Sequence, residues 1–505
     1  MTPETLFSQP LATDYSRKWH VLITVGMGIF LATIDGTIVT VALPTLVEQL
    51  NTDFPTIQWV TLAYLLVVTV LLLGMGRLGD MVGKKKPYQI GMILFGTASA
   101  ACGLAPGVEW LIVFRVVQAI GASTMQALGT AIITEAFPPT ERGRALGIGG
   151  VLVSAGILAG PVLGGILIDN VGWRAIFFVN VPIALAGAFM VHAFVPEGTR
   201  RPGQRFDIPG AVALGLSLTA LMIALTLGQN WGWGDGRTLG LLAAFALLFV
   251  LFVSIELRTS QPMVDLTLFR NPEFAIGLST AMLVFIAIAS RIVIPFFLEQ
   301  GQGLSVTTIG LILAVWPLAI AVVAPLAGWL SDRLGGMRIS LAGLIVSAIG
   351  YWLIGELLSL DISPLAFALL IAPTGLGVGL FQAPNNSAVM GSVPKERLGL
   401  ASGFLALTRN MGQLIGIAAI GALWATQTLA HVPPELAGAI TDASEAPPAA
   451  IAAGMADTSM VLAAMMGLTA ILGVIGVWFE KQQRQAAAQL MPETVYNKHE
   501  GTTGT

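Results

Sequence analysis

Fourteen runs of about twenty mostly apolar residues divide this chain, and they constrain its fold more than any other feature. Because a helix rises about 1.5 Å per residue and the hydrocarbon core of a bilayer is about 30 Å thick, each run can cross a membrane. Only 10% of the residues are charged, against roughly a quarter in a soluble domain. We therefore expect an all-α polytopic membrane protein. The predicted spans are 19–43, 56–78, 87–105, 109–135, 142–168, 173–195, 208–228, 238–257, 273–298, 307–330, 338–357, 363–390, 400–428 and 457–479.

Lysine and arginine are distributed unequally between the loops on the two sides. Twenty of the 25 lie in the tails and in one set of loops, two (Arg174 and Arg237) lie in the opposite loops, and three fall inside spans. Basic residues of short loops stay in the cytoplasm, so both termini are expected to be cytosolic and the protein to lie in the plasma membrane. The start of the chain lacks a basic region followed by a short apolar core and a cleavage site, which predicts a cytosolic tail and not a cleaved signal.

Two pairs of similar segments indicate an internal repeat. The segment "GRLGDMVGKK" at 76–85 is similar to "GWLSDRLGGM" at 328–337, and "PTERGRA" at 139–145 is similar to "PKERLGLA" at 394–401, with offsets of 252 and 255 residues. Chance is the alternative, since such glycine and aspartate patterns are frequent between membrane helices. A repeated six-helix unit with an inserted helix pair is predicted. The predicted divisions are the tail 1–18, the bundle 19–199, the inserted pair with its linkers 200–272, the bundle 273–480 and the tail 481–505.

Several motifs occur in order along the chain: "IDGTIVTVALP" from Ile34, "GRLGDMVGKKK" from Gly76, "RVVQAIG" from Arg115, "GILAGPVLGG" from Gly156 and "WRAIFFVNVP" from Trp173. Together they resemble the signatures of the major facilitator superfamily, and in particular of its fourteen-helix drug:proton antiporters. The chain departs from these signatures at Ala119, where glycine is usual, and at Thr40, where asparagine is usual. The resemblance implies two six-helix bundles plus two inserted helices, alternating access, and proton-coupled efflux of drugs or amphipathic compounds.

The loop motif between the second and third spans is interpreted as part of a gate. Asp80 at a helix end is expected to bind the positive end of a neighbouring helix and either Arg142 or Arg144, which holds the cytoplasmic side closed. A solvated loop is the alternative, and it explains the lysines but not the acid. Asp332 with Arg333 is a weaker counterpart in the second half. The predicted gating residues are Gly76, Asp80, Gly83, Lys84, Arg142, Arg144 and Asp332.

The glycines of the fifth span recur every four residues and so share one helix face. Small residues let a second helix approach closely, and Pro161 removes one intrahelical hydrogen bond. A close, bendable interface suits a helix that must rock, although ordinary small-residue packing has the same pattern. The predicted helix-bending residues are Gly156, Gly160, Pro161, Gly164 and Gly165.

Asp35 lies near the middle of the first span, where an ionisable group costs about 2.5–3.5 kcal/mol on insertion scales and marks a pathway. It lies about 13 Å from the outer end of its helix, and Arg115 lies about 9 Å from the same surface. We therefore predict an Asp35–Arg115 pair that exchanges a proton for substrate. The alternatives are a purely structural ion pair, or an acid bonded only to Thr33 or Thr37.

Arg291 has no carboxylate nearby in the sequence, so its charge requires a partner, water or an anionic substrate; snorkelling to the outer surface is the alternative. Arg409, in "RNMG", is interpreted as structural more often than as a substrate contact. Aromatic and amide side chains suit the cavity of a transporter for amphipathic ligands. The predicted cavity residues are Trp59, Tyr64, Gln118, Gln126, Arg291, Trp316, Phe381, Gln382, Asn385, Asn386 and Arg409.

These features favour a monomeric secondary antiporter whose partners are an amphipathic substrate, protons and the bilayer. The alternative is an exporter or flippase of an anionic or lipid-like substrate, motivated by the three arginines inside spans. An enzyme is disfavoured because the four histidines are not grouped with carboxylates, and neither a cofactor, a metal nor a Walker sequence is indicated. The net charge of −3 argues against nucleic-acid binding.

Overall fold

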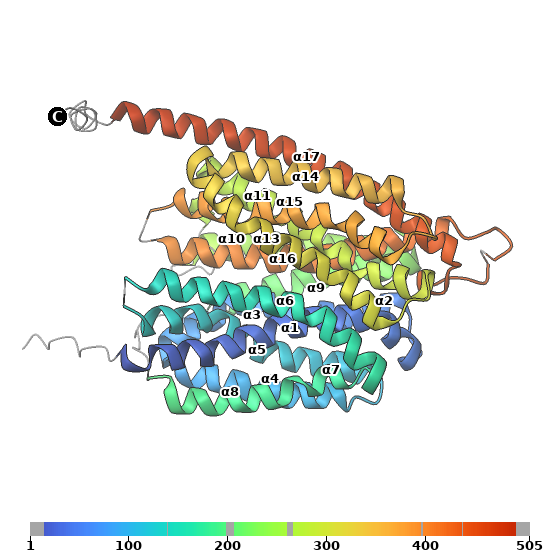
Figure 1. Cartoon of the computed structure of the whole chain (residues 1–505), viewed down its shortest axis with the longest axis horizontal. Helices are drawn as coiled ribbons and strands as arrows, with labels where there is room; N and C mark the ends of the chain where they lie inside the picture. Colours follow the sequence, from blue (N-terminus) through green and yellow to red (C-terminus); the bar gives the residue numbers. More distant parts are fainter. Residues whose placement is uncertain are drawn as a thin grey trace, which may run out of the picture.

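The computed structural model describes residues 15–138, 140–197, 207–259, 266–394, 397–436 and 438–490, in which no strand occurs. The long helices run side by side, and the first and last described helices begin and end on the same side of the molecule (Figure 1). We call this side the terminal end and the opposite side the distal end. The helices are α1 (Lys18–Leu50), α2 (Phe54–Ile57), α3 (Trp59–Val82), α4 (Lys85–Gly103), α5 (Val108–Ala136), α6 (Arg142–Val171), α7 (Ala175–Phe178), α8 (Asn180–Phe194), α9 (Ile208–Trp231), α10 (Gly236–Arg258), η2 (Leu266–Arg270), α11 (Pro272–Ile288), η3 (Ala289–Ile292), α12 (Ile294–Phe296), η4 (Phe297–Gly301), α13 (Val306–Leu334), α14 (Gly336–Leu357), α15 (Pro364–Gly391), α16 (Leu398–Ala430), η6 (Ala443–Glu445) and α17 (Pro448–Leu490).

Thirteen of the helical segments in the described residues are long and apolar enough to cross a membrane. The fourteenth, α4, has 19 residues but starts with polar ones, including Lys85, Lys86 and Gln89, which lower its mean hydropathy. The predicted all-α membrane fold is confirmed. Three spans differ clearly from their predicted positions. Residues 1–14 of the predicted tail 1–18 and residues 491–505 of the predicted tail 481–505 lie outside the described residues.

Two of these differences concern proline. The first predicted span, 19–43, ends before Pro44, but α1 continues through Pro44 to Leu50 and ends where Asn51 adopts a left-handed conformation with φ of 48°. The predicted spans 400–428 and 457–479 leave an outer segment at 429–456 between them. Because proline is tolerated in the first turn of a helix, α17 already begins at Pro448, and only 431–447 connects it to α16, with η6 inside this connection.

The third difference is a break in the ninth span, predicted as one helix over 273–298. The α-helix α11 ends at Ile288 and is followed by the short turns η3, α12 and η4. Pro295, which has no N–H to donate to the carbonyl of Arg291 four residues earlier, lies in the first turn of α12, after the break. The break places Arg291 in the 3₁₀ turn η3, with Val293 N bonded to Ser290 O at 3.1 Å.

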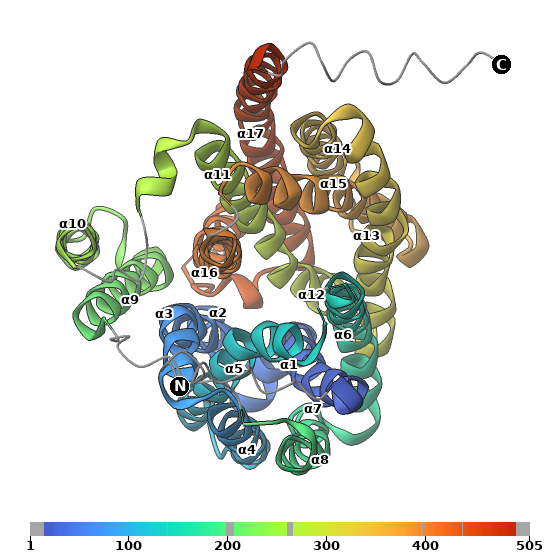
Figure 2. The same cartoon turned by 90° about the vertical axis from the view of Figure 1, so that its left-hand side faces the viewer.

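The helices form two halves, α1 to α8 and α11 to α17, which face each other across the molecule (Figure 2). The inserted pair α9 and α10 lies at one side of the junction, where α9 packs against α3 of the first half and α16 of the second. The helix α10 packs on α9, and its side chains are mostly exposed. The predicted boundary at 199/200 falls outside the described residues, α11 begins at Pro272 beside the predicted boundary at 272/273, and α17 continues through the predicted boundary at 480/481 to Leu490.

The two halves share one close helix crossing that our sequence comparison missed. A Cβ atom on Gly91 of α4 would lie 3.1 Å from the carbonyl oxygen of Gly121 of α5. In the second half, a Cβ atom on Gly377 of α15 would lie 2.7 Å from the carbonyl oxygen of Gly343 of α14. Backbones this close tolerate glycine alone. The offsets of these glycines are 252 and 256 residues, which agrees with the repeat inferred from the loops.

Candidate functional site

A cavity of about 730 Å³ lies between the two halves, lined by α1, α3, α5 and α6 on one side and by α11, η3, α15 and α16 on the other. It reaches toward the terminal end, because its lining includes Gly76 near the end of α3, Leu146 near the start of α6 and Ser402 near the start of α16. Its volume is within the range of about 300–1,000 Å³ that is typical of small-molecule sites.

Asp35 of α1 lies behind the wall of this cavity and is fully buried. Its Oδ2 accepts a hydrogen bond from Arg115 Nη1 of α5 at 2.5 Å. Its Oδ1 accepts from Gln118 Nε2 at 2.9 Å and from Asn180 Nδ2 of α8 at 3.0 Å. The predicted pairing of Asp35 with Arg115 is confirmed as a contact, and the alternative of an acid bonded only to Thr33 or Thr37 is wrong.

Arg115 connects this network to the cavity, which it lines together with Tyr64 of α3. Its Nε donates to the carbonyl oxygen of Val60 at 3.0 Å, and its guanidinium carbon lies 4.1 Å from the centre of the Tyr64 ring. Its Nη2 is buried and has no hydrogen-bond partner among the described residues. Asp35 and Val60 therefore fix the guanidinium, and Nη2 is the one of its nitrogens that is left without a partner in the described part of the chain.

Gln118 belongs to this network and not to the cavity lining, where we predicted it. It accepts from Arg115 Nη1 at 2.6 Å and donates to Ser99 Oγ of α4 at 2.6 Å. Ser99 and Asn180 were missed at the sequence level. Asn180 is nevertheless a polar residue in the apolar run "WRAIFFVNVP", and that pattern could have identified it.

The second half contributes Arg291 of η3 and Arg409 of α16 to the lining. The guanidinium carbon of Arg291 lies 4.4 Å from the centre of the Trp316 ring, and its Nε is buried without a hydrogen-bond partner in the part of the chain described. The guanidinium stays at the cavity, so the alternative that Arg291 snorkels to the outer surface is wrong. Within the described ranges, neither arginine forms a hydrogen bond or ion pair with another side chain.

Six of the eleven predicted cavity residues line this cavity, namely Tyr64, Gln126, Arg291, Gln382, Asn386 and Arg409. The predictions for the other five are wrong. Trp59 and Phe381 pack in the core, and Gln118 is in the Asp35 network. Asn385 is buried and donates to Gly277 O at 3.1 Å. Trp316 borders a separate cavity of about 20 Å³.

Threonines and amides that we did not predict also line the cavity. Their spacing along each helix follows one face, as in Thr33, Thr37 and Thr40 of α1, and this periodicity is visible in the sequence. On α16 the same rule places Asn410 and Gln413 on the lining face. Asn410 Nδ2 donates to Gln126 Oε1 of α5 at 3.1 Å, which joins the two halves across the cavity.

At the terminal end, Asp80 pairs with Lys84 and not with Arg142 or Arg144. Lys84 Nζ lies 3.1 Å from Asp80 Oδ1 and 2.7 Å from Glu135 Oε1 of α5. Burial on its own lowers the pKa of Lys84, but the hydrogen bonds and charges of Glu135 and Asp80 outweigh it, so this pKa is raised. Asp80 lies in the last turn of α3 and Lys84 directly before α4, and the turn at Gly83, with φ of 94°, brings the two side chains together.

The two predicted arginine partners have other contacts. Arg142 Nε donates to the carbonyl oxygen of Phe137 at 3.2 Å, and the guanidinium of Arg144 lies 5.4 Å from the ring of Trp19. Asp332 in the second half is exposed and has no ion pair among the described residues. The repeat places Gly336 where the first half has Lys84, so the counterpart of that ion pair cannot form.

The glycines of α6 contact two different helices. Gly156, Gly160 and Gly164 face α1, where a Cβ atom on Gly164 would lie 2.9 Å from Ile38. Gly165 faces α13 of the other half, and a Cβ atom there would lie 2.7 Å from Thr307 Cα. Pro161 lies inside α6, and its carbonyl oxygen closely approaches Gly310 of α13. The motif therefore forms part of the contact between the halves.

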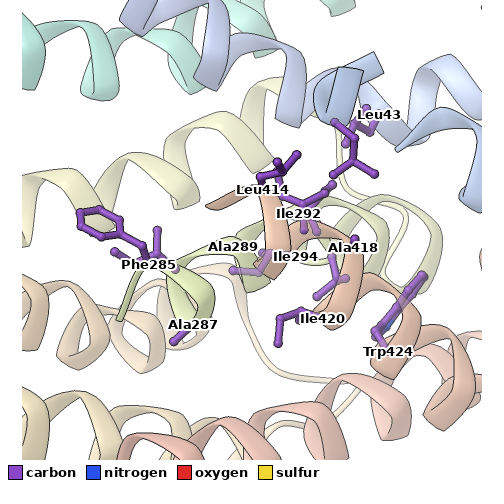
Figure 3. Packing of buried hydrophobic residues seen from close by; sticks show 14 of the residues in the cluster. Leu43, Phe285, Ala287, Ala289, Ile292, Ile294, Leu414, Ala418, Ile420 and Trp424 are labelled. Carbon is purple, nitrogen blue, oxygen red and sulfur yellow. The ribbon is translucent and has the colours of Figure 1, made fainter. Parts of the chain in front are cut away.

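Three aromatic rings close the distal end. The ring of Phe54 of α2 lies 5.0 Å from that of Phe296 of α12 and 4.7 Å from that of Trp424 of α16. The same buried cluster contains Leu43 of α1 together with Ile292 and residues of α16 (Figure 3). Apolar packing thus joins the first half to the second at this end.

Hydrogen bonds between the halves accompany this packing at the distal end. They are Thr45 Oγ1 to Glu299 Oε1 at 3.0 Å, Phe54 N to Asp442 Oδ2 at 2.7 Å and Thr307 N to Asp169 Oδ2 at 2.8 Å. With the aromatic cluster they make the distal end the closed end in this conformation. The cavity thus reaches toward one end only, as expected for one state of an alternating-access transporter.

The family model of the Major Facilitator Superfamily matches residues 25–299 and, a second time, residues 274–490. The chain belongs to this superfamily. It is thus a multi-pass membrane transporter and not an enzyme. The first match includes the inserted pair and the start of the second half, and the second match covers the second half from residue 274 onward.

Several named proteins align with most of this chain. The riboflavin transporter RibZ of Clostridioides difficile is 35% identical over 412 residues, which is 81% of this chain and 89% of that protein. The tetracenomycin C resistance and export protein of Streptomyces glaucescens is 32% identical over 462 residues, which is 88% of this chain and 85% of that protein. A solved bacterial homologue of the human drug peptide transporters PepT1 and PepT2 has the same fold, with a TM-score of 0.64 at 15% identity, over 92% of this chain and 99% of that chain.

Proposed function

We propose that this protein is a secondary antiporter that exports amphipathic compounds in exchange for protons by alternating access. The observation that carries the proposal is the cavity between the halves, open toward the terminal end and closed at the distal end, with the Asp35 network directly behind its wall. The distribution of basic residues supports a plasma-membrane protein whose terminal end faces the cytosol. One chain forms the whole cavity, so a monomer is proposed as the functional unit.

Asp35 is the proposed proton site. Its carboxylate is held by three donors, from Arg115, Gln118 and Asn180, and a bound proton would remove the charge that these donors stabilise. Without that charge, Arg115 loses the partner that holds its free Nη2 at the cavity wall. A substrate that contacts Arg115 therefore favours the unprotonated acid, and a proton disfavours the substrate, which is the condition for exchange.

The contacts between the halves suggest how the cavity changes sides. Gly165 and Pro161 of α6 approach α13 backbone to backbone, and the side chain of Asp169 bonds to Thr307 N at the distal end of this contact. Such an interface can rotate while it stays packed. The distal contacts of Phe54 and Thr45 would open in the same movement, and the ion pairs of Lys84 would move with α3 and α5.

Transport in phosphatidylcholine proteoliposomes tests this proposal. Three probes with the same fluorophore and different charge serve as substrates: dansylglycine (anionic), dansylamide (neutral) and dansylcadaverine (cationic). A pH gradient across the membrane should drive accumulation of the probe that binds, and a protonophore should abolish it. Accumulation of that probe to the same level with and without the gradient would contradict proton coupling.

A further inference from the structure

We propose that the cavity selects organic anions, in which a carboxylate, sulfonate or phosphate group is attached to an apolar body. Arg291 and Arg409 would bind the anionic group. The inference rests on the proposed function in one respect, because it takes this cavity as the transport site. It names the class of substrate that the cavity accepts.

The first argument is the charge of the lining. Arg115, Arg291 and Arg409 line the cavity, and in the described part of the chain the lining contains neither Asp nor Glu. Asp35 lies behind the wall and is paired with Arg115. Opposite charges attract more strongly where water is scarce, so this cavity favours an anion and repels a cation.

The second argument is the state of Arg291. Its guanidinium stacks on Trp316, which fixes its plane, and its Nε is buried with no partner among the described residues. An unpaired buried donor is unfavourable until an acceptor reaches it, and a guanidinium binds carboxylate or phosphate oxygens through parallel N–H groups. The helix break after Ile288 puts this side chain in the turn η3 at the cavity wall.

The third argument is that Arg409 lies on a helix that packs against η3. Figure 3 shows Ala289 and Ile292 of η3 close to Leu414 of α16, and these elements are in contact. On α16, Arg409 shares its lining face with Gln413, one turn away. Like Arg291, Arg409 has no ion pair to an acid in the residues described. Two uncompensated guanidinium groups therefore lie on the same wall.

The rest of the lining suits the apolar body of such a compound. Val68, Leu72, Val153 and Ile157 provide apolar surface on the first-half side. The threonine hydroxyls of α1 provide adaptable hydrogen bonds, although Thr33 and Thr37 also bond to their own helix backbone. An anionic head on the second half and an apolar body against the first half make use of both walls.

Equilibrium binding of the three dansyl probes to the purified protein, in phosphatidylcholine nanodiscs without a pH gradient, tests this inference. The expected order of affinity is dansylglycine, then dansylamide, then dansylcadaverine, with at least a tenfold difference between the first two. Arg291→Gln and Arg409→Gln should each weaken dansylglycine at least tenfold and change dansylamide less than threefold. Arg409→Lys should restore part of the loss because it keeps the positive charge.

Arg333→Gln is the matched control, because Arg333 also stacks on a tryptophan, at 4.0 Å from the Trp329 ring, but is exposed and outside the cavity. This variant should bind all three probes as the wild type does. If dansylglycine binds no tighter than dansylamide, or if both cavity variants retain its full affinity, the inference is wrong. Because binding is measured without a proton gradient, the order of probe affinities does not depend on whether transport is coupled to protons. Conversely, the transport experiment tests proton coupling whichever probe binds most tightly.

The anionic group could belong to a soluble compound or to a lipid head group. Lysophosphatidylglycerol and lysophosphatidylcholine, added as competitors, distinguish these sources. If only the anionic lipid displaces dansylglycine, Arg291 and Arg409 also bind anionic lipid head groups. Displacement by neither lipid would restrict the site to soluble organic anions, and equal displacement by both would contradict recognition of charge.

Discussion

The two halves of this transporter differ in whether their arginines inside the membrane spans are paired with an acid. In the first half, Arg115 is paired with Asp35, which Gln118 and Asn180 also hold. In the second half, Arg291 and Arg409 line the same cavity with no acid among the described residues beside them. A closed network suits a site that stores a proton, and unpaired donors suit a site that binds a ligand. We infer that the two tasks are divided between the halves.

The internal repeat makes this difference clearer. The backbone crossing at Gly91 and Gly121 recurs at Gly343 and Gly377, so the two halves share their packing. The same offsets of 252–256 residues place Asp35 onto 287–291, where the charged residue is Arg291, and Arg115 onto the apolar segment 367–371. The scaffold is duplicated and its charges are not.

Of the substitutions considered, removal of the Asp35 carboxylate should reduce transport most. Asp35→Asn leaves the side-chain shape but not the charge, so gradient-driven transport should fall by about 100-fold or more, as expected when a group essential to each cycle is lost. Loss of one partner of a buried ion pair also costs about 3–5 kcal/mol of stability. The double variant Asp35→Asn with Arg115→Gln should recover thermal stability without recovering transport. Asp53→Asn, which keeps the hydrogen bond to Thr56 N at the start of α2, should transport normally.

Opening of the distal end should have the next largest effect. Trp424→Ala removes a fully buried ring that contacts Phe54 and Phe296, and truncation of such a side chain costs about 3–5 kcal/mol. The substitution Thr40→Cys, in a Cys102→Ala background, places a single cysteine in the cavity lining. In the Trp424→Ala variant, we expect this cysteine to be labelled from the distal side at least ten times faster. The control Trp478→Ala changes an exposed ring of α17 and should label like the parent. Equal labelling rates in all three would mean that the aromatic cluster does not close this end.

A smaller loss is expected at the contact between α6 and α13. Gly165→Val places side-chain atoms against the backbone of Thr307, so transport should fall about tenfold, since overpacking costs typically 1–3 kcal/mol. Gly147→Val, in the same helix, meets no atom within 4 Å and is the matched control. Full transport by Gly165→Val would show that this interface does not move during the cycle.

The smallest effect is expected at the terminal end. Lys84→Met removes two ion pairs and should lower the unfolding midpoint by a few degrees, equivalent to about 1 kcal/mol. The raised pKa of Lys84 means that its contribution is fully present below its ordinary pKa of 10.5 and is lost as the pH rises through the higher folded value. The difference in midpoint from the wild type should therefore shrink above pH 10.5. The exposed Lys86→Met is the control, and a difference that stays constant with pH would contradict this assignment.

Much of the fold followed from the sequence because apolar runs, loop charges and glycine spacing are local signals. The depth of a residue along its helix is also local, so Asp35 and Arg115 could be paired before the structure was known. The rotation of one helix about its axis relative to its neighbours is not local. That is why Ser99 and Asn180 were missed, and why Phe381 and Asn385 were wrongly placed in the cavity. The Asp80–Lys84 pair was missed because it depends on the turn at Gly83 between α3 and α4, and the spacing in the sequence does not determine that turn.

Proton release upon ligand binding is the most direct test of the division between the halves. Neutral dansylamide, which adds no charge next to Asp35, is added at saturating concentration to purified protein in weakly buffered solution, and the change in pH is recorded for the wild type and for Asp35→Asn. The account predicts that binding releases protons from the wild type and none from Asp35→Asn, although this variant still binds the probe. Equal release by both proteins, or proton uptake by the wild type, would contradict it.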